Sequence, residues 1–182
     1  KLLHTLLASP CSGHATFEKF DVLLRECACT ITNTDLTAVQ WIQASLPIRN
    51  GGLDVRRVSS LAPSAFLASA AGTRDLQDMI LSKCDASVDS AVDNALVQWS
   101  IVHGQSGALP PVGSASTKQQ EWDKPSIAAD VARLNASLPG RHHQARLLAV
   151  SAPHSGDWLH ALPISSCGLR LDDEAVRVAV GL

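Results

Sequence analysis

The sequence predicts a mainly α-helical protein with one small β-hairpin, and three observations lead to this fold class. Ala, Ser and Leu dominate the 182 residues, which include no Tyr and only 4% aromatic residues. This composition favours helices that approach one another closely. Apolar side chains recur at helical spacing over several segments. The third observation is Asn50-Gly51-Gly52, the strongest turn signal in the chain.

Two helices are expected before this turn. Apolar residues at helical spacing predict the first helix over residues 15–31, with Cys27 on its buried stripe. Asn33 or Thr34 offers an N-cap for the second helix, which is expected to end at Pro47. Both helices are predicted from local patterns alone.

Residues 46–55 are expected to form the hairpin, as two extended segments around the turn. A helix of small residues is predicted to begin at Pro63, which suits a first helical turn, and to end before Gly72. Thr73 and Ser87 are expected to cap two further helices.

The segment 103–117 is rich in Gly, Pro and Ser, and it predicts a surface linker. We therefore expect two regions, residues 1–102 and residues 118–182. The second region is predicted to be a helical segment, with a short helix that Pro125 ends and a longer helix that Ser126 caps.

Three more helices are expected toward the C-terminus. The dipeptide Pro139-Gly140 separates the helix before it from a helix over residues 141–152. Ser155 is expected to cap a short helix, and Asp172 a final one. Three tryptophans of the chain are expected to be core anchors: Trp99, Trp122 and Trp158.

The acidic run Leu171-Asp172-Asp173-Glu174 invites comparison with the paired Asp residues that hold Mg²⁺ in polymerases. That chemistry needs the carboxylates on a tight turn between strands, beside a third acid. Here the acids precede an apolar helical pattern, where capping and the helix dipole explain them without chemistry. We therefore predict a helix start and no metal.

Several kinds of catalytic or metal site are excluded by pattern. The chain has no nucleophile elbow, phosphate loop or dinucleotide fingerprint. Cys27-Ala28-Cys29 lacks the spacing of a zinc ligand pair, and His142-His143 point about 100° apart on a helix. We predict no catalytic residue, no metal and no cofactor in this chain.

Composition also limits the partners and the compartment. The net charge of −2 excludes a global field for nucleic acid, so any such contact must come from a local basic patch. The five Cys are irregularly spaced, which indicates free thiols in a reducing compartment. We expect an intracellular chain, nuclear or cytoplasmic. No run of apolar residues predicts a membrane span, and no membrane partner is expected.

One basic patch stands out around the turn. Arg49, Arg56 and Arg57 lie on either side of it, with Asn50 within it and Trp41 just upstream. Guanidinium groups on a rigid turn can bind phosphates through two hydrogen bonds, and an indole can stack on a base. These five are the candidate nucleic-acid-binding residues. The alternative interpretation is that the arginines are ordinary solvated charges of a hairpin.

The stretch Trp41–Leu53 resembles a segment of non-LTR (LINE-type) retrotransposon reverse transcriptases, written W-x-x-A-x-L-P-x-R-x-G-G-L-G-I, that follows the catalytic palm. Leu61–Ser69 continues the likeness as a small-residue helix. His154–Pro163 and Gly168–Glu174 resemble the region that links the polymerase thumb to a downstream zinc knuckle. These blocks span most of the chain. The sequence departs from the pattern at Asp54, where the family has Gly.

The resemblance implies that residues 1–102 are a thumb-like helical region and that residues 118–182 lead to a missing downstream domain. It also implies that the palm, with its Asp-Asp box and Mg²⁺, precedes this chain, and that a zinc knuckle and an endonuclease follow it. Lys1 is not an initiator Met, and we expect a fragment. A carboxylate at position 54 is expected to weaken phosphate binding by the nearby arginines.

Two functions are therefore expected. In the first, the chain is a non-catalytic part of a reverse transcriptase, an RNA-directed DNA polymerase, and helps to hold the RNA/DNA template–primer through its backbone. In the second, it is a non-enzymatic helical protein-interaction module, and the arginine patch is incidental.

Overall fold

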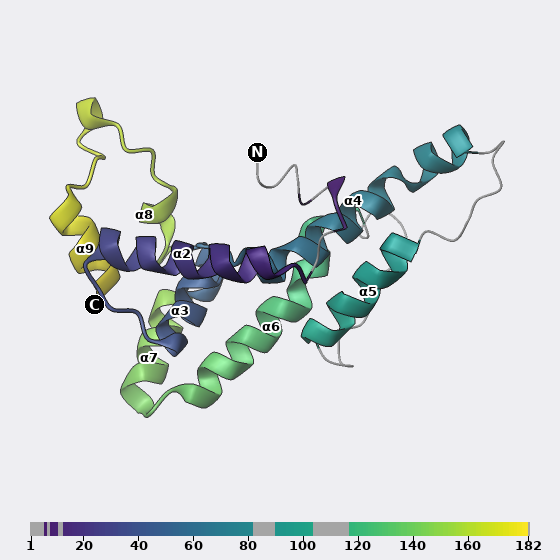
Figure 1. Cartoon of the computed structure of the whole chain (residues 1–182). Coiled ribbons are helices and arrows are strands. Elements are labelled where there is room, and N and C mark those ends of the chain that lie inside the picture. Colours follow the sequence, from purple (N-terminus) through teal and green to yellow (C-terminus); the bar gives the residue numbers. More distant parts are fainter. Residues whose placement is uncertain (1–5, 7, 11–12, 82–89, 104–116, 182) are drawn as a thin grey trace. The chain divides into compact units, whose positions relative to one another are not determined.

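The structure is a computed structural model that describes residues 6, 8–10, 13–81, 90–103 and 117–181, and this part of the chain is mainly helical. The predicted helical class is confirmed. In chain order (Figure 1) the elements are α2 (Ala15–Thr32), α3 (Ala38–Ser45), η1 (Ile48–Asn50), α4 (Val58–Leu81), α5 (Ser90–His103), α6 (Gln119–Ser137), α7 (Arg141–Val150), α8 (Asp157–His160), η2 (Ser165–Cys167) and α9 (Asp173–Gly181).

The chain forms two compact units, and each is discontinuous in sequence. Unit 1 comprises Lys1–Glu18 and Arg57–Ala129, and unit 2 comprises Lys19–Arg56 and Asp130–Leu182. Each unit therefore draws on both of the regions predicted from sequence. The predicted linker at 103–117 lies almost wholly outside the described residues, so it stays a prediction.

The predicted hairpin is wrong, because the described residues contain no β-strand. Residues 46–55 form a compact turn whose backbone N–H groups bond to the end of α3 and not to a partner strand. Leu53 and Val55 donate to the carbonyl of Ala44 over 3.1 and 3.3 Å, and Asp54 donates to that of Leu46 over 2.9 Å. The last carbonyls of a helix lack partners within the helix. Here the turn supplies them, so its donors are not available for a strand ladder.

Two pairs of predicted helices are each one continuous helix. Pro63, Gly72 and Thr73 all lie inside α4, and Pro125 lies inside α6. The Thr73 hydroxyl donates to the carbonyl of Ser69 over 2.9 Å, within the helix, and does not cap a new one. Pro and Gly disfavour helix interiors by about 3 and 1 kcal/mol relative to Ala, and packing routinely overrides such preferences.

Unit 1 is built around two tryptophans from α5 and α6. Trp99 is 1% exposed and Trp122 is 6% exposed, and their rings meet edge-to-face with centroids 5.5 Å apart. The indole N–H of Trp99 donates to the carbonyl of Trp122 over 3.0 Å, and the Ser64 hydroxyl of α4 donates to the same carbonyl over 3.3 Å. Leu67 and Ala68 of α4 and Ala95 of α5 complete the buried cluster. The predicted anchoring role of these two tryptophans is confirmed.

Unit 1 has a second buried cluster, in which α4 packs on the N-terminal segment. Leu6, Val58, Ala62 and Ala65 are each at most 3% exposed, and Phe17 packs against them. Small residues on α4 allow this close approach, as the composition predicts. The side of α4 that carries Ala62 and Ala65 is therefore buried.

In unit 2, the start of α3 lies a few residues after the predicted position. Thr37, and neither Asn33 nor Thr34, caps α3: its hydroxyl accepts from the N–H of Gln40, whose side chain accepts from the N–H of Thr37. Asn33 instead ends α2 with a φ of 51°, a left-handed conformation that Asn tolerates. Cys27, predicted on a buried stripe, is exposed.

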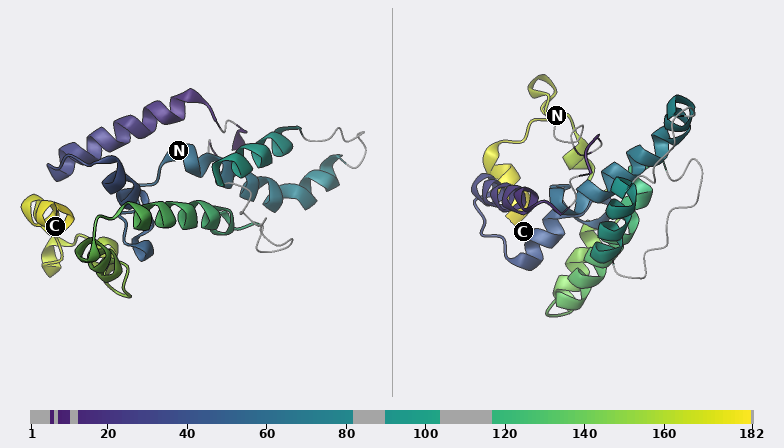
Figure 2. Two further views of the ribbon diagram at one scale, coloured as in Figure 1. Left: turned by 90° about the horizontal axis from the view of Figure 1, so that it is seen from below. Right: turned by 45° about the vertical axis from the view of Figure 1, so that its right-hand side comes forward.

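Helices α7 and α9 of unit 2 start as predicted, but α8 does not: its N-cap is Gly156, and the Ser155 hydroxyl donates to the carbonyls of Val150 and Ala152 over 2.6 and 2.7 Å and caps no helix. Pro139 and Gly140 separate α6 from α7. Asp172 caps α9, since its carboxylate accepts from the N–H of Ala175 over 2.7 Å. Helix α9 lies beside the C-terminal end of α2 (Figures 1 and 2), where Arg177 Nε donates to the carbonyl of Ile31 over 3.4 Å. Within the described residues, no helix combines the length and the hydropathy that a membrane crossing needs.

Candidate nucleic-acid interface

The candidate site of unit 2 is the turn between α3 and α4, here called the glycine turn and defined as residues 47–54. It begins with one turn of 3-10 helix, in which Asn50 and Gly51 donate to the carbonyls of Pro47 and Ile48 over 2.8 and 2.9 Å. The side-chain amide of Gln43 donates to the carbonyl of Gly51 over 3.2 Å. Since α3 supplies donors and acceptors to both parts of the turn, the backbone of the turn is rigidly held.

Two glycines of the turn are required, Gly52 by space and Gly51 by both space and conformation. A Cβ at Gly52 would lie 2.0 Å from the carbonyl oxygen of Leu46 and 2.6 Å from that of Gln43. Gly51 has a φ of +79°, and a Cβ there would lie 2.7 Å from the Ser151 hydroxyl and 2.8 Å from a methyl group of Val150. Glycine is the residue that permits such close backbone approach. The turn therefore packs on the C-terminal end of α7.

A third glycine brings a distant segment to the turn. A Cβ at Gly156, just before α8, would lie 2.1 Å from Cγ2 of Ile48. The segment around Gly156 is one of the blocks that carry the family resemblance, and Ile48 belongs to another. These two blocks are about a hundred residues apart in sequence and in direct contact within unit 2.

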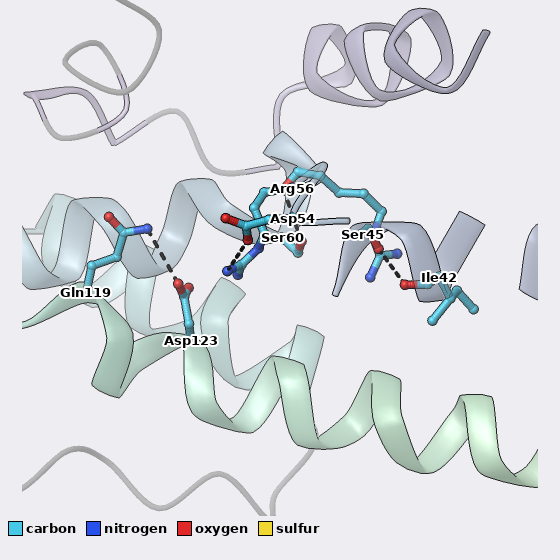
Figure 3. Close-up of polar contacts among 8 residues, drawn as sticks. Ile42, Ser45, Asp54, Arg56, Ser60, Gln119 and Asp123 are labelled. Carbon is cyan, nitrogen blue, oxygen red and sulfur yellow. Dashed lines mark hydrogen bonds and ion pairs between the residues drawn. The ribbon is translucent and has the colours of Figure 1, made fainter. Parts of the chain in front are cut away.

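Asp54 lies at the end of the turn with a left-handed backbone, at a φ of 58°. The family pattern has Gly at this position, and a positive φ is the conformation for which Gly is the default and Asp a tolerated substitute. The Asp54 carboxylate forms an ion pair with Arg56, with 3.9 Å between Oδ1 and Nη1 (Figure 3). The expectation that a carboxylate at 54 weakens phosphate binding by the arginines stays a prediction, and the ion pair with Arg56 gives it a physical basis.

The five predicted site residues differ in how accessible they are. Arg49 is exposed on η1 and has no ion pair with any described residue. Arg56 is only 24% exposed and is paired with Asp54, while Arg57 is half-buried at the start of unit 1. Asn50 is half-buried, and its side-chain oxygen is buried. Trp41 is 8% exposed, so its indole packs as a core side chain of unit 2. Arg49 is thus the most accessible cation of the predicted set.

Sequence reasoning missed two further cations of unit 2. Arg141 and Arg146 lie on α7, are exposed, and make no ion pair with any described residue. From sequence, this helix is weighed only for zinc binding by His142 and His143. The signal that could have revealed the arginines is charge patterning, because no acidic residue lies between Asp130 and Asp157.

The acidic residues at the start of α9 and His154 next to α8 have structural surroundings that need no metal or catalytic role. Asp172, Asp173 and Glu174 begin α9 beside Arg170 and Arg177, around an open hollow. His154 lies 2.9 Å from the carboxylate of Asp157, and both side chains are largely exposed. Across the described ranges, no group of three or more His, Cys, Asp or Glu residues is arranged to hold a metal ion.

Comparisons with protein-family models, with curated proteins and with solved structures give no significant match.

Proposed function

We propose that this chain is a non-catalytic part of a non-LTR retrotransposon-type reverse transcriptase and helps to hold the RNA/DNA template–primer duplex by backbone contacts. The observation that carries the proposal is the glycine turn, which presents Arg49 on a rigid backbone without an ion-pair partner among the described residues. A fixed guanidinium suits bidentate binding of a phosphate and carries no base information.

The geometry also accounts for the residues that carry the resemblance. Gly51, Gly52 and Asp54 occupy the positions where the pattern has Gly, and each has either a positive φ or no room for a side chain. Two separate blocks of the resemblance meet at Ile48 and Gly156. The glycine positions of the resemblance therefore coincide with the closely packed positions of the glycine turn. In this proposal the polymerase chemistry, with its Mg²⁺, belongs to a palm domain and not to this chain.

The direct test is binding of a fluorescent RNA–DNA hybrid by the full 182-residue chain, measured by anisotropy over a salt series. Arg49→Ala should weaken binding about fivefold at low salt and make the slope of log K against log salt shallower by about one. The matched control is Arg74→Ala, which removes an exposed arginine of α4 in unit 1. Equal affinities of wild type and Arg49→Ala would overturn the role of the turn.

A second candidate, a helical protein-interaction module, is favoured by the end of α4. Leu76, Met79 and Ile80 are spaced as one helical stripe and are 51%, 68% and 66% exposed. Exposed apolar patches are typical of interaction surfaces. This candidate predicts that the wild-type chain does not bind the hybrid at any salt concentration. The coding sequence upstream separates the two as well, since the first requires an aromatic-x-Asp-Asp box there.

A further inference from the structure

Helix α7 carries a basic face that the glycine turn does not use. Its sequence contains Arg141, His142, His143 and Arg146 and no acidic residue, and all four basic side chains are exposed. The next acids along the chain, Asp130 and Asp157, lie outside the helix on either side. This absence of acids leaves the positive charge of the helix uncompensated locally.

The direction of this face follows from the helix geometry. Leu147 is the buried residue of α7, at 8% exposed. At about 100° per residue, Arg141 and Arg146 point roughly 120° and 100° away from Leu147, on opposite sides, and His142 lies between them. The glycine turn packs on the side of Leu147 and Val150. The face with Arg141, His142 and Arg146 therefore points away from the turn, and it is here called the α7 basic face.

The spacing of the two arginines indicates the kind of ligand. They are separated by about 7.5 Å along the helix axis and by about 140° around it, so they suit two separate anions better than one. Both are exposed and have no ion-pair partner among the described residues. Between them the outward surface carries Ala145 and Ala149. Small side chains allow a sugar-phosphate strand to approach closely. The bulky apolar side chain beside this face is Leu148, which is 73% exposed and lies at its edge next to Arg141, whereas an amphipathic helix that enters a membrane carries a full apolar face.

We infer that the α7 basic face is a second nucleic-acid contact, in which Arg141 and Arg146 bind phosphates of one strand and His142 lies against the strand between them. The contact is on the opposite side of α7 from the glycine turn. The inference rests on the proposed function, because that function supplies nucleic acid as the partner. The choice of Arg141, His142 and Arg146 comes from the structure of α7 alone. Two contacts on different sides of one helix would let unit 2 hold two segments of nucleic acid.

The test uses the full chain and the same labelled hybrid, with Arg141→Ala/Arg146→Ala as the variant. We expect a loss of about tenfold in affinity at low salt and a salt slope shallower by about two, one for each phosphate contact. The charge-matched control is Arg74→Ala/Arg170→Ala, which removes two other exposed arginines without ion-pair partners among the described residues. Circular dichroism of each variant verifies that helix content is unchanged.

The outcomes separate the two proposals. If Arg49→Ala weakens binding and the α7 double variant binds like wild type, the inference about α7 is overturned and the proposed function stands. If only the α7 variant loses affinity, the α7 contact stands and the role of the turn falls. An equal loss in the control double variant would show that net charge alone is measured, which overturns the inference. It is also overturned if the α7 variant loses binding only to phosphatidylserine vesicles.

Discussion

Each compact unit contains one closely packed site, and the two sites pack in opposite ways. In unit 1 the site is filled with large side chains: Trp99 and Trp122 meet edge-to-face, and the carbonyl of Trp122 accepts hydrogen bonds from the Trp99 indole and from the Ser64 hydroxyl of α4. In unit 2 backbone segments come together where side chains are missing, at Gly51, Gly52 and Gly156. The comparison teaches that the two sites are sensitive to opposite changes. The tryptophan site should lose stability when a side chain is shortened, and the glycine turn when one is added.

The largest effect is expected for Trp99→Ala in unit 1. This change removes a side chain that is 1% exposed together with its hydrogen bond to the carbonyl of Trp122. Truncations of buried Trp lower the free energy of unfolding by about 3–5 kcal/mol, through lost burial and the cavity left behind. Hydrogen exchange of the α5 amides measures the loss for unit 1 itself.

The matched control for this change is Trp158→Ala in unit 2. The sequence suggested a core position for Trp158, but its side chain is 36% exposed. We expect its replacement to change the free energy of unfolding by about 0.5 kcal/mol, as for surface substitutions. Similar losses for the two variants would contradict the assignment of unit 1 as the unit held by tryptophan packing.

A smaller effect, of the opposite kind, is expected for Gly52→Ala in unit 2. The new Cβ would lie 2.0 Å from a backbone oxygen of Leu46, which cannot move away as the end of a side chain could. Overpacking of this type costs about 1–3 kcal/mol, and a backbone clash belongs at the upper end. Urea unfolding followed by circular dichroism measures it.

Gly140→Ala makes the comparison specific, because it adds the same methyl group in the same unit. A Cβ there meets no atom within 4 Å, and the φ of 169° is extended backbone that any residue adopts. We expect Gly140→Ala to leave the unfolding curve near that of wild type. If Gly52→Ala were equally harmless, the close packing of the glycine turn on α3 would be refuted.

The smallest effect on stability, and the most informative for function, is expected for Asp54→Asn. Asn tolerates the left-handed φ of 58° as Asp does. The ion pair with Arg56 is exposed on the Asp54 side, so its loss changes the free energy of unfolding by less than about 1 kcal/mol. Removing a negative charge beside the arginines should tighten binding of the RNA–DNA hybrid about threefold at low salt.

The control for this variant is Asp35→Asn, which removes one exposed carboxylate elsewhere in unit 2. Anisotropy titrations of both variants should show the gain for Asp54→Asn alone. An equal gain for Asp35→Asn would mean that the hybrid responds to net charge and not to the arginines of the turn.

Much of the helix pattern could be predicted because its signals act within a few residues. Asp172 caps α9 through the N–H three residues ahead, and Pro139-Gly140 breaks the chain wherever the neighbours lie. The end of α3 just before Pro47 is likewise set by a local signal. Of the candidate site, the sequence indicated Arg49 and the need for two glycines, since both follow from residue type.

Residues whose role depends on distant neighbours were not predictable in this way. Trp41 was proposed as a stacking surface, but it is buried in unit 2. Residues 46–55 were expected to form a hairpin, but the N–H groups of Leu53 and Val55 bond to the carbonyl of Ala44 at the end of α3. Which way the exposed arginines of α7 point is defined only when Leu147 shows which side of the helix is buried.

The sequence by itself determined that the chain is helical, where most helices start and stop, and that a rigid turn carries an arginine. These properties depend on backbone conformation and hydrogen bonds between near neighbours. Only the tertiary structure decided that helices continue through Pro63 and Pro125, and which cations remain accessible. The physical reason is that burial and hydrogen bonds from other helices outweigh local preferences of about 1–3 kcal/mol, and those partners are far away in the chain.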